Sequence, residues 1–425
     1  MRTRLAKIAK ILTKIYGDKL SAQQLEKLKQ AEAETADYIE LLGKQLIEKF
    51  ESPLDGYAYP VKIGDTYAAQ FDLSGDSEKT DIDCLAALKD KIISRVNPPA
   101  SLGQSWLVWG QLTADDQDVL ETAKNCYSKL NLFPNAKWEI DLQTAGKFLG
   151  ADVYELWCPP GDRGNIEQNY HVLICLFPYN NAQQIGDISN KVANLYPHLL
   201  QLFLYRNKVI SSYTKSRQLK ANLKEASRII KEIFTQLPLQ VTAAKFDLKQ
   251  LQQTLVNCLT ICSMYAQHFS ALEEQENTIK THLENYKRRL EIIGKDMGSD
   301  AQDFKFMAKF SDFARDKYIW QMEADNRSLS PNLRLLENAI ETIEGIIEIE
   351  RAKSDRALNV TIGAAGVGIA TSGVVASTYA SQIKSPASDK NTWADNDVFA
   401  LSIGSGIVLS LVTVILLKII NRKRR

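Results

Sequence analysis

The chain has 425 residues and a formal net charge of +1. Its length is enough for two or three domains, and its balanced charge gives no bias toward nucleic acid. The six cysteines include no Cys-x-x-Cys pair, which favours reduced, mostly buried thiols in a cytoplasmic protein. The four histidines are scattered along the chain, which argues against a zinc site.

Residues 1–52 are predicted to form two helices. Apolar residues from Leu5 to Ile15 lie on one face of a basic helix, and the lysines between them exclude a signal peptide. This helix either packs on its own protein or lies on an anionic membrane surface. The second helix begins at Ser21, which forms a capping box with Gln24, and runs to about Phe50.

Residues 53–205 are predicted to form a cytosolic α/β domain. Six runs rich in β-branched and aromatic residues are typical of strands. They are residues 57–63, 67–73, 106–112, 138–142, 153–158 and 171–177. Helices are predicted between them at 82–95 and 114–130. The strand order does not follow from the sequence.

Residues 206–356 are predicted to form a helical coiled-coil stalk, within a helical region that begins near Asn181. Fifteen positions in it alternate steps of three and four residues, and only Glu276 among them is charged. They are Leu248, Leu251, Leu255, Cys258, Cys262, Tyr265, Phe269, Leu272, Glu276, Ile279, Leu283, Tyr286, Leu290, Ile293 and Met297. This seam predicts a helix of about 75 Å, at 1.5 Å per residue.

Two further helices are predicted after a break at residues 298–300. The first carries the aromatic residues Phe306, Phe310, Phe313 and Trp320. The second begins at Pro331, since proline is well tolerated in a first helical turn. No helix-breaking residue separates it from the apolar residues that follow, so we expect one continuous rod from about Pro331 to about Tyr379.

The last seventy residues are predicted to form a membrane hairpin. Ala357–Ile383 and Val398–Leu417 contain no charged residue, and each run is long enough to cross the hydrocarbon core as a helix. Lys384–Asp397 between them is polar and contains Pro386, which is typical of a turn. The basic tail Asn421–Arg425 should remain cytoplasmic. Because two crossings return the chain to its starting side, both termini and the bulk of the chain are expected in the cytoplasm.

Small residues in the two runs are the candidate site of helix packing or pore lining. They recur at every fourth position, which lets another backbone approach closely. They are Ala364, Gly368, Ser372, Ala376, Ser402, Gly406 and Ser410. Two interpretations remain open: several chains surround a pore lined by their first runs, or the hairpins pack tightly in a dimer that does not conduct.

The order of these segments resembles the CorA family of divalent-cation channels. The likeness is in layout: a cytosolic α/β domain, long helices, a stalk helix that continues into the first of two C-terminal crossings, and a basic tail. The Gly-Met-Asn triplet of that family is absent from residues 377–382, so no family site residues are carried over. The stretches 205–208 and 216–220, together with the hairpin, also resemble cyanobacterial membrane proteins.

No motif indicates an enzyme. Asp72, Asp76, Asp81 and Asp83 allow a metal-site interpretation, but an acidic first turn of the following helix accounts for the last two. The turn at residues 161–164 is not followed by the Lys-Ser or Lys-Thr of a phosphate loop. The sequence therefore predicts no catalytic residue, no metal and no cofactor.

We therefore expect an α+β, mostly helical, integral membrane protein of the inner (plasma or thylakoid) membrane that assembles as a homo-oligomer. The leading functional hypothesis is a channel or pore gated by the cytosolic α/β and stalk domains, which would bind a ligand or partner. The alternative is a non-conducting tether or scaffold that recruits partners through its coiled coil.

Overall fold

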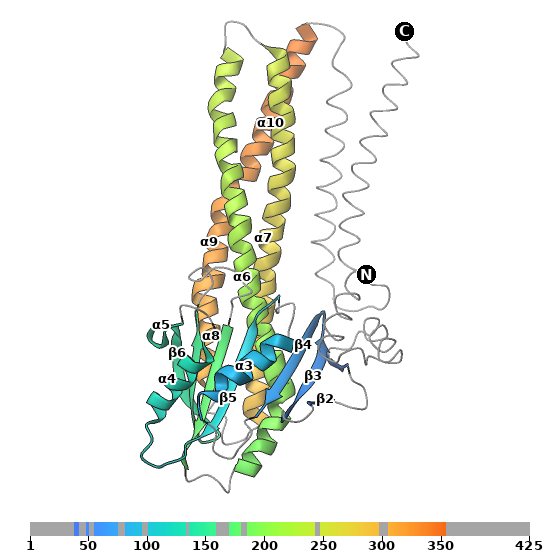
Figure 1. Ribbon diagram of the computed structural model, residues 1–425. Helices are drawn as coiled ribbons and strands as arrows, with labels where there is room; N and C mark the ends of the chain where they lie inside the picture. Colours follow the sequence, from blue (N-terminus) through green and yellow to red (C-terminus); the bar gives the residue numbers. More distant parts are fainter. Residues whose placement is uncertain are drawn as a thin grey trace. The chain divides into compact units, whose positions relative to one another are not determined.

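The computed structural model describes ten ranges of the chain. They are residues 38–41, 48–50, 55–74, 81–95, 101–132, 136–158, 170–179, 185–242, 247–296 and 305–353. Within them the chain is mostly helical, with an α/β part followed by long helices, as predicted (Figure 1). The chain divides into two compact units: unit 1 comprises residues 1–217 and 274–323, and unit 2 comprises residues 218–273 and 324–425.

The larger part of unit 1 is built on a four-stranded sheet in the order β5-β8-β7-β6. These strands are β5 (Gln104–Gln111), β6 (Leu142–Phe148), β7 (Ala151–Trp157) and β8 (Tyr170–Phe177). β5 and β8 are parallel, whereas β8, β7 and β6 are successively antiparallel. Nearly every residue of β8 is buried, which indicates that both faces of this strand are covered.

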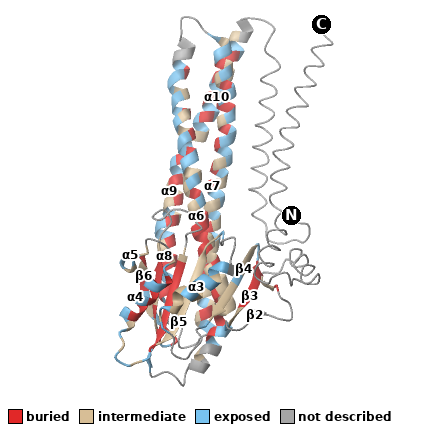
Figure 2. Cartoon of the chain, viewed as in Figure 1, coloured by how far each residue is buried: buried red, intermediate tan, exposed pale blue. Residues whose placement is uncertain are grey.

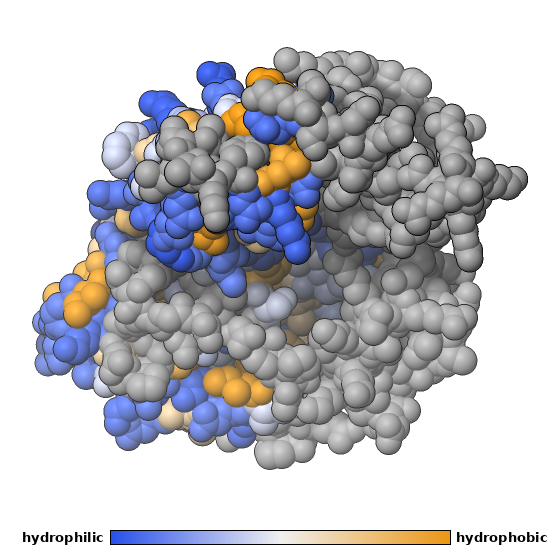
Figure 3. Space-filling model, turned by 90° about the horizontal axis from the view of Figure 1, so that it is seen from above, coloured by the Kyte–Doolittle hydropathy of each residue, from blue (hydrophilic) through white to orange (hydrophobic). Residues whose placement is uncertain are grey.

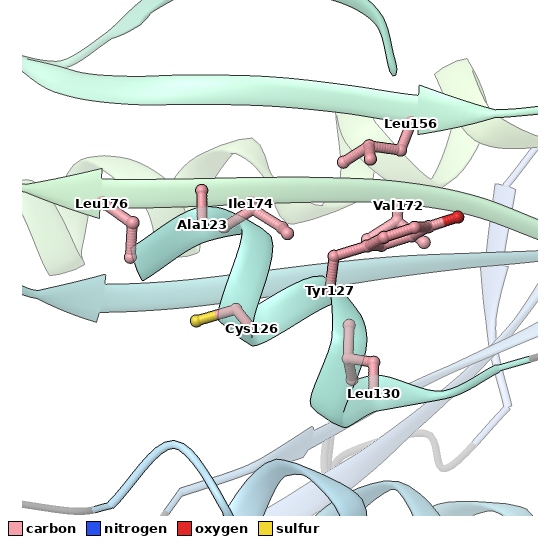
Figure 4. Close-up of a cluster of buried hydrophobic side chains, with 8 residues drawn as sticks. All are labelled: Ala123, Cys126, Tyr127, Leu130, Leu156, Val172, Ile174 and Leu176. Carbon is pink, nitrogen blue, oxygen red and sulfur yellow. The ribbon is translucent and has the colours of Figure 1, made fainter. Parts of the chain in front are cut away.

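One face of this sheet packs against helix α4 (Val119–Leu130). Asp118 caps the helix, because its carboxylate accepts hydrogen bonds from the backbone of Leu120 and Glu121. Apolar side chains of α4 meet those of β7 and β8 in one cluster (Figure 4). Its members are Ala123, Cys126, Tyr127, Leu130, Leu156, Val172, Ile174 and Leu176. The opposite face carries the alternate residues of β7 and β8.

A second four-stranded sheet in unit 1 is centred on β3. Its strands are β1 (Tyr38–Glu40), β2 (Glu48–Lys49), β3 (Gly56–Ile63) and β4 (Thr66–Leu73). β3 pairs antiparallel with each of the other three. Its buried residues Tyr59, Val61 and Ile63 pack against Leu204, which belongs to the long helix α6.

Two elements of unit 1 differ from the sequence prediction. The helix expected to run to Phe50 is wrong over β1 and β2, because both pair with β3 and the Tyr38 hydroxyl lies 2.9 Å from that of Tyr59. The strand expected at 138–142 begins instead with helix α5 (Trp138–Asp141). The buried Asp141 carboxylate holds this turn, since it accepts from Lys137 N at 2.8 Å and from the Tyr127 hydroxyl at 2.7 Å.

Helices α6 (Ile185–Thr242) and α7 (Leu248–Asp296) contribute to both units. The shorter helix α3 (Cys84–Arg95) belongs to unit 1 alone. The seam predicted along α7 is confirmed, because its buried positions recur along the helix with the expected three-four spacing (Figure 2). Eleven are buried: Leu251, Leu255, Cys258, Cys262, Tyr265, Phe269, Leu272, Ile279, Leu283, Tyr286 and Ile293.

The next helical stretch contains a π-helix that the sequence analysis did not predict. α8 (Lys305–Phe313) continues into the π-helix η5 (Ala314–Ile319) and then into α9 (Trp320–Leu329). Five of the buried positions of this stretch are separated by steps of four residues: Phe306, Phe310, Ala314, Tyr318 and Met322. Met307, Ser311, Asp325 and Leu329 are buried as well. In an α-helix each such step overshoots a full turn by about 40°, so four steps would turn Met322 away by about 160°. The wider π-turn takes up part of this drift.

In unit 2, helix α10 (Pro331–Lys353) begins at the predicted proline and packs against α6 and α7. The core comprises Leu237, Leu251, Leu255, Cys258, Leu259, Ala339, Ile343 and Ile347. At the break before α10, the Leu333 amide donates to the Ser330 carbonyl at 3.3 Å. The Leu329 carbonyl accepts a hydrogen bond from the buried Tyr265 hydroxyl at 2.8 Å. The side-chain amide of Asn332 donates a hydrogen bond to the same hydroxyl at 3.0 Å.

None of the helices in the described ranges has the length and apolar character that a membrane crossing requires. The predicted crossings 357–383 and 398–417 lie outside those ranges, as do the basic N-terminal helix and the part of the expected rod beyond Lys353.

We expect Tyr265→Phe to lower the free energy of unfolding by roughly 1–3 kcal/mol, because the buried Leu329 carbonyl and the Asn332 amide lose a partner. Chemical denaturation of the full chain in detergent measures the change. Tyr179→Phe is the control, since Tyr179 is exposed and its substitution should have almost no effect. Equal stabilities of the two variants would contradict this role for the Tyr265 hydroxyl.

Candidate functional site: a buried charged cluster

A histidine and a glutamate are buried together on the sheet face opposite α4. Glu155 belongs to β7 and His171 to β8, and neither side chain is accessible to solvent. His171 Nε2 lies 3.0 Å from Glu155 Oε1, and its Nδ1 lies 3.3 Å from Ser105 Oγ on β5. A row of hydrogen bonds therefore runs across three neighbouring strands.

Arg206 of α6 brings a charge to the same place. Its side chain is fully buried, and none of its three guanidinium nitrogens has a hydrogen-bond partner among the described residues. The guanidinium carbon lies 4.9 Å from the ring centroid of Trp157 and 4.9 Å from that of Phe310. Cation–π attraction to the two rings therefore stands in for hydrogen bonds. A buried guanidinium without hydrogen bonds is uncommon in native proteins, which makes this cluster the candidate functional site.

Burial dominates the titration of the cluster. It raises the pKa of Glu155 to about 7, against the attraction of Arg206 and Lys309. Burial also lowers the pKa of His171 well below its usual value, and the nearby Arg206 charge lowers it further. The pKa of Arg206 is lowered by burial and raised by Glu155. Near neutral pH the histidine is thus uncharged, while the charge on Glu155 is finely balanced.

Helix α8 is pressed against the sheet beside this cluster. Trp157 of β7 meets Phe310 and Phe313 edge to face, with ring centroids 5.8 and 5.1 Å apart. Gly146 of β6 permits the close approach, because a Cβ there would lie only 2.7 Å from a ring carbon of Phe306. The aromatic residues of α8 therefore connect the charged cluster to the helical stretch that continues through η5 into α9.

The Ser105–His171–Glu155 row has the residue types of a hydrolytic triad, but its surroundings do not suit catalysis. The base of such a triad must reach a substrate, whereas His171 is fully buried under Phe203, whose ring centroid lies 5.2 Å away. Its lowered pKa also makes it a poor proton acceptor. The row is accounted for by strand pairing, since Ser105 and His171 are register partners.

The sequence-predicted site residues lie outside the described ranges. They are Ala364, Gly368, Ser372, Ala376, Ser402, Gly406 and Ser410. Of the acidic residues weighed as a metal site, Asp72 accepts from the Tyr196 hydroxyl and Asp81 from the Asp83 amide before α3. The described ranges contain no group of three His, Cys, Asp or Glu residues placed to hold a metal ion.

The sequence analysis missed the cluster, although each member leaves a signal. Glu155 interrupts the apolar end of a strand, and Arg206 lies in a segment of α6 whose apolar residues Leu202, Leu204, Val209 and Ile210 are buried. A charge in such a position is rarely left unpaired. The sequence does not show that the charges of Glu155 and Arg206 interact, because the two residues come from different elements, β7 and α6.

Comparisons with protein-family models, with curated proteins and with solved structures gave no match. The functional argument therefore depends on the geometry of this chain and on its sequence.

We expect Glu155→Gln to change how stability depends on pH. The raised pKa means that folded Glu155 keeps a proton that the unfolded chain loses above pH 4.5, so wild-type stability falls as pH rises from 4.5 through about 7. The shift from 4.5 to about 7 corresponds to roughly 3 kcal/mol at 1.36 kcal/mol per pKa unit. The glutamine variant should lack this decline.

Denaturation of both proteins between pH 5 and 8 measures the difference. The lowered pKa of His171 has the opposite effect, loss of stability as pH falls below 6.5, and it should cancel because both proteins keep this residue. Glu139→Gln, at an exposed position of α5, is the matched control. Parallel pH profiles for wild type and Glu155→Gln would contradict the raised pKa.

Proposed function

We propose that the chain is a homo-oligomeric channel or pore of the inner (plasma or thylakoid) membrane, gated by its cytosolic part. One structural observation supports the gating: α8 packs on the charged cluster, and the chain stays helical from there to Lys353, with a single break at Ser330. In the sequence, the uncharged run from Ala357 begins four residues after Lys353. A change at the cluster therefore has a helical path toward the expected first crossing.

The cluster offers a source of two states. An ionised Glu155 neutralises Arg206 but loses its hydration, whereas a protonated Glu155 leaves Arg206 as the only full charge between two rings. The free energies of the ionised and the protonated state of Glu155 are nearly equal at neutral pH. A small bias from a ligand, a partner or a proton would therefore shift the population from one of these states to the other. Phe310, which contacts both Arg206 and Trp157, would pass the shift to α8.

A non-conducting tether is the second candidate. Val256 and Met264 on α7 are exposed apolar side chains in the stalk, and they could contribute to a surface that recruits a partner. Recruitment requires only that the stalk is attached to a membrane, so it does not depend on the helical path described above.

The membrane hairpin is tested by topology. A reporter fused after Arg425 should be active only in the cytoplasm, and one inserted near Ser388 only on the other side, because the basic tail remains cytoplasmic. Activity of both reporters on one side, or the reverse pattern, would contradict both candidate functions in their present form.

Gating is tested by conductance of the purified chain in liposomes at pH 6 and pH 8, on either side of the value of about 7 for Glu155. We expect four glycines inserted after Glu350 to abolish the pH response but not membrane insertion, because glycine weakens the helix by about 1 kcal/mol per residue. Four alanines at the same place keep the chain helical and should preserve the response.

The two insertions also separate the candidates. A pH response that survives the glycine insertion unchanged would contradict the helical path. A chain that never conducts, with or without insertions, would contradict the channel and favour the tether.

A further inference from the structure

The guanidinium of Arg206 is buried without an acceptor for its hydrogen bonds. In Figure 3 hydrophilic residues cover most of the described surface, where charged side chains ordinarily lie. The side chains of Arg228 and Arg315 are 58% and 54% exposed, whereas Arg206 is 0% exposed. Its three guanidinium nitrogens have no hydrogen-bond partner in the part of the chain that the structure describes. Because arginine keeps its proton in proteins, five N–H donors and a positive charge are buried there.

The two neighbouring rings attract this charge but do not replace an acceptor. The guanidinium carbon lies 4.9 Å from the ring centroids of Trp157 and Phe310, and these centroids are 5.8 Å apart. The three centres therefore form a triangle, so the rings cover only part of the surroundings of the guanidinium. An aromatic ring is also a much weaker acceptor of N–H hydrogen bonds than a negatively charged group.

Glu155 is the source of negative charge beside Arg206. Its charge attracts Arg206, but its carboxylate does not form a hydrogen bond with the guanidinium, and its Oε1 lies 3.0 Å from His171 Nε2. The Tyr286 hydroxyl of α7 donates to a backbone carbonyl of α8 at 3.0 Å. The other titratable groups that act on the cluster are ordinarily not anions near neutral pH. They are His171, Tyr286, Lys309 and Tyr318.

We propose that the charged cluster binds one small, singly charged anion such as chloride beside Arg206 when Glu155 is protonated. Protonation removes the negative charge that compensates Arg206, and a buried charge without compensation is strongly unfavourable. A bound anion would supply both a negative charge and an acceptor for the N–H donors. Ionised Glu155 would repel the anion, so the binding of a proton and the binding of the anion favour each other.

The surroundings of Arg206 suit a halide better than a larger anion. Arg206 brings one positive charge, which one negative charge neutralises, whereas a phosphate group carries nearly two. Trp157 and Phe310 present aromatic rings, whose edges carry partial positive charge and suit an anion. Arg206 and the side chains of Glu155 and His171 are at most 1% exposed, so an organic carboxylate with a carbon chain has little room.

The test measures the stability of the full chain in detergent while chloride replaces gluconate at constant ionic strength. Both salts screen surface charges equally, but gluconate is too large for the cluster. At pH 6 the unfolding equilibrium constant should fall about tenfold when chloride reaches ten times its dissociation constant. This effect should be lost as pH rises through about 7, because Glu155 then ionises. Equal stability in the two salts at pH 6 would overturn the proposal.

Glu155→Gln separates the anion from a general effect of salt. Glutamine is neutral at every pH, so chloride should stabilise this variant equally at pH 6 and pH 8. The wild-type chain should respond much less at pH 8. A Glu155→Gln variant that gains no response to chloride at pH 8 would overturn the proposal, as would a wild-type response that is the same at both pH values.

Arg206→Gln removes the charge that attracts the anion and should abolish the response to chloride. Arg228→Gln is the matched control, because Arg228 lies on the same helix and is exposed, so this variant should respond like the wild type. Ordered water could also serve the donors of Arg206, and chloride would then act equally on both variants, which would overturn the proposal. If Arg206→Gln does not fold, the comparison with Glu155→Gln remains decisive.

Bromide locates the site directly, because its anomalous scattering identifies it in a crystal of the full chain. We expect a peak beside the Arg206 guanidinium at pH 6. Peaks only at surface lysines and arginines would mark adventitious ions and would overturn the proposal.

The outcomes separate the anion site from the proposed function. Binding depends only on residues of unit 1, whereas an effect of the anion on gating rests on the proposed channel. A chain that responds to chloride but does not conduct supports the anion site and contradicts the channel. A chain that conducts in a pH-dependent way but whose stability does not respond to chloride overturns only the anion site.

Discussion

The burial of one guanidinium constrains most of unit 1. Arg206 comes from a long helix, and two aromatic rings lie over it from β7 and from α8. The loss of hydration of the Arg206 guanidinium would cost more free energy without these rings and the nearby Glu155 carboxylate. The sheet, α6 and α8 must therefore keep their places together, and the absence of a side chain at Gly146 lets α8 come close enough.

Periodicity in the sequence predicted the elements that depend on a single repeating pattern. The three-four spacing of α7 gave its buried face, and β7 and β8 followed from apolar and aromatic runs. The failures occurred where a tertiary contact overrides local preference. β1 becomes a strand because β3 offers it a partner, and α5 becomes a turn of helix because Asp141 is buried against Tyr127.

The charged cluster could not be assembled from the sequence, because no local pattern joins its parts. Glu155 and His171 are 16 residues apart and meet only through the register of β7 and β8, while Arg206 arrives from a helix.

The π-helix η5 has a consequence for how this protein can vary between species. The buried positions Phe310, Ala314, Tyr318 and Met322 lie within and on both sides of the six residues that form the wider turn, which keeps them closer to one face. Loss of one residue there would turn Met322 by about 100° off that face. Exposed loops tolerate changes of length, but natural selection should hold the spacing from Phe310 to Met322 constant even where the residues between them change.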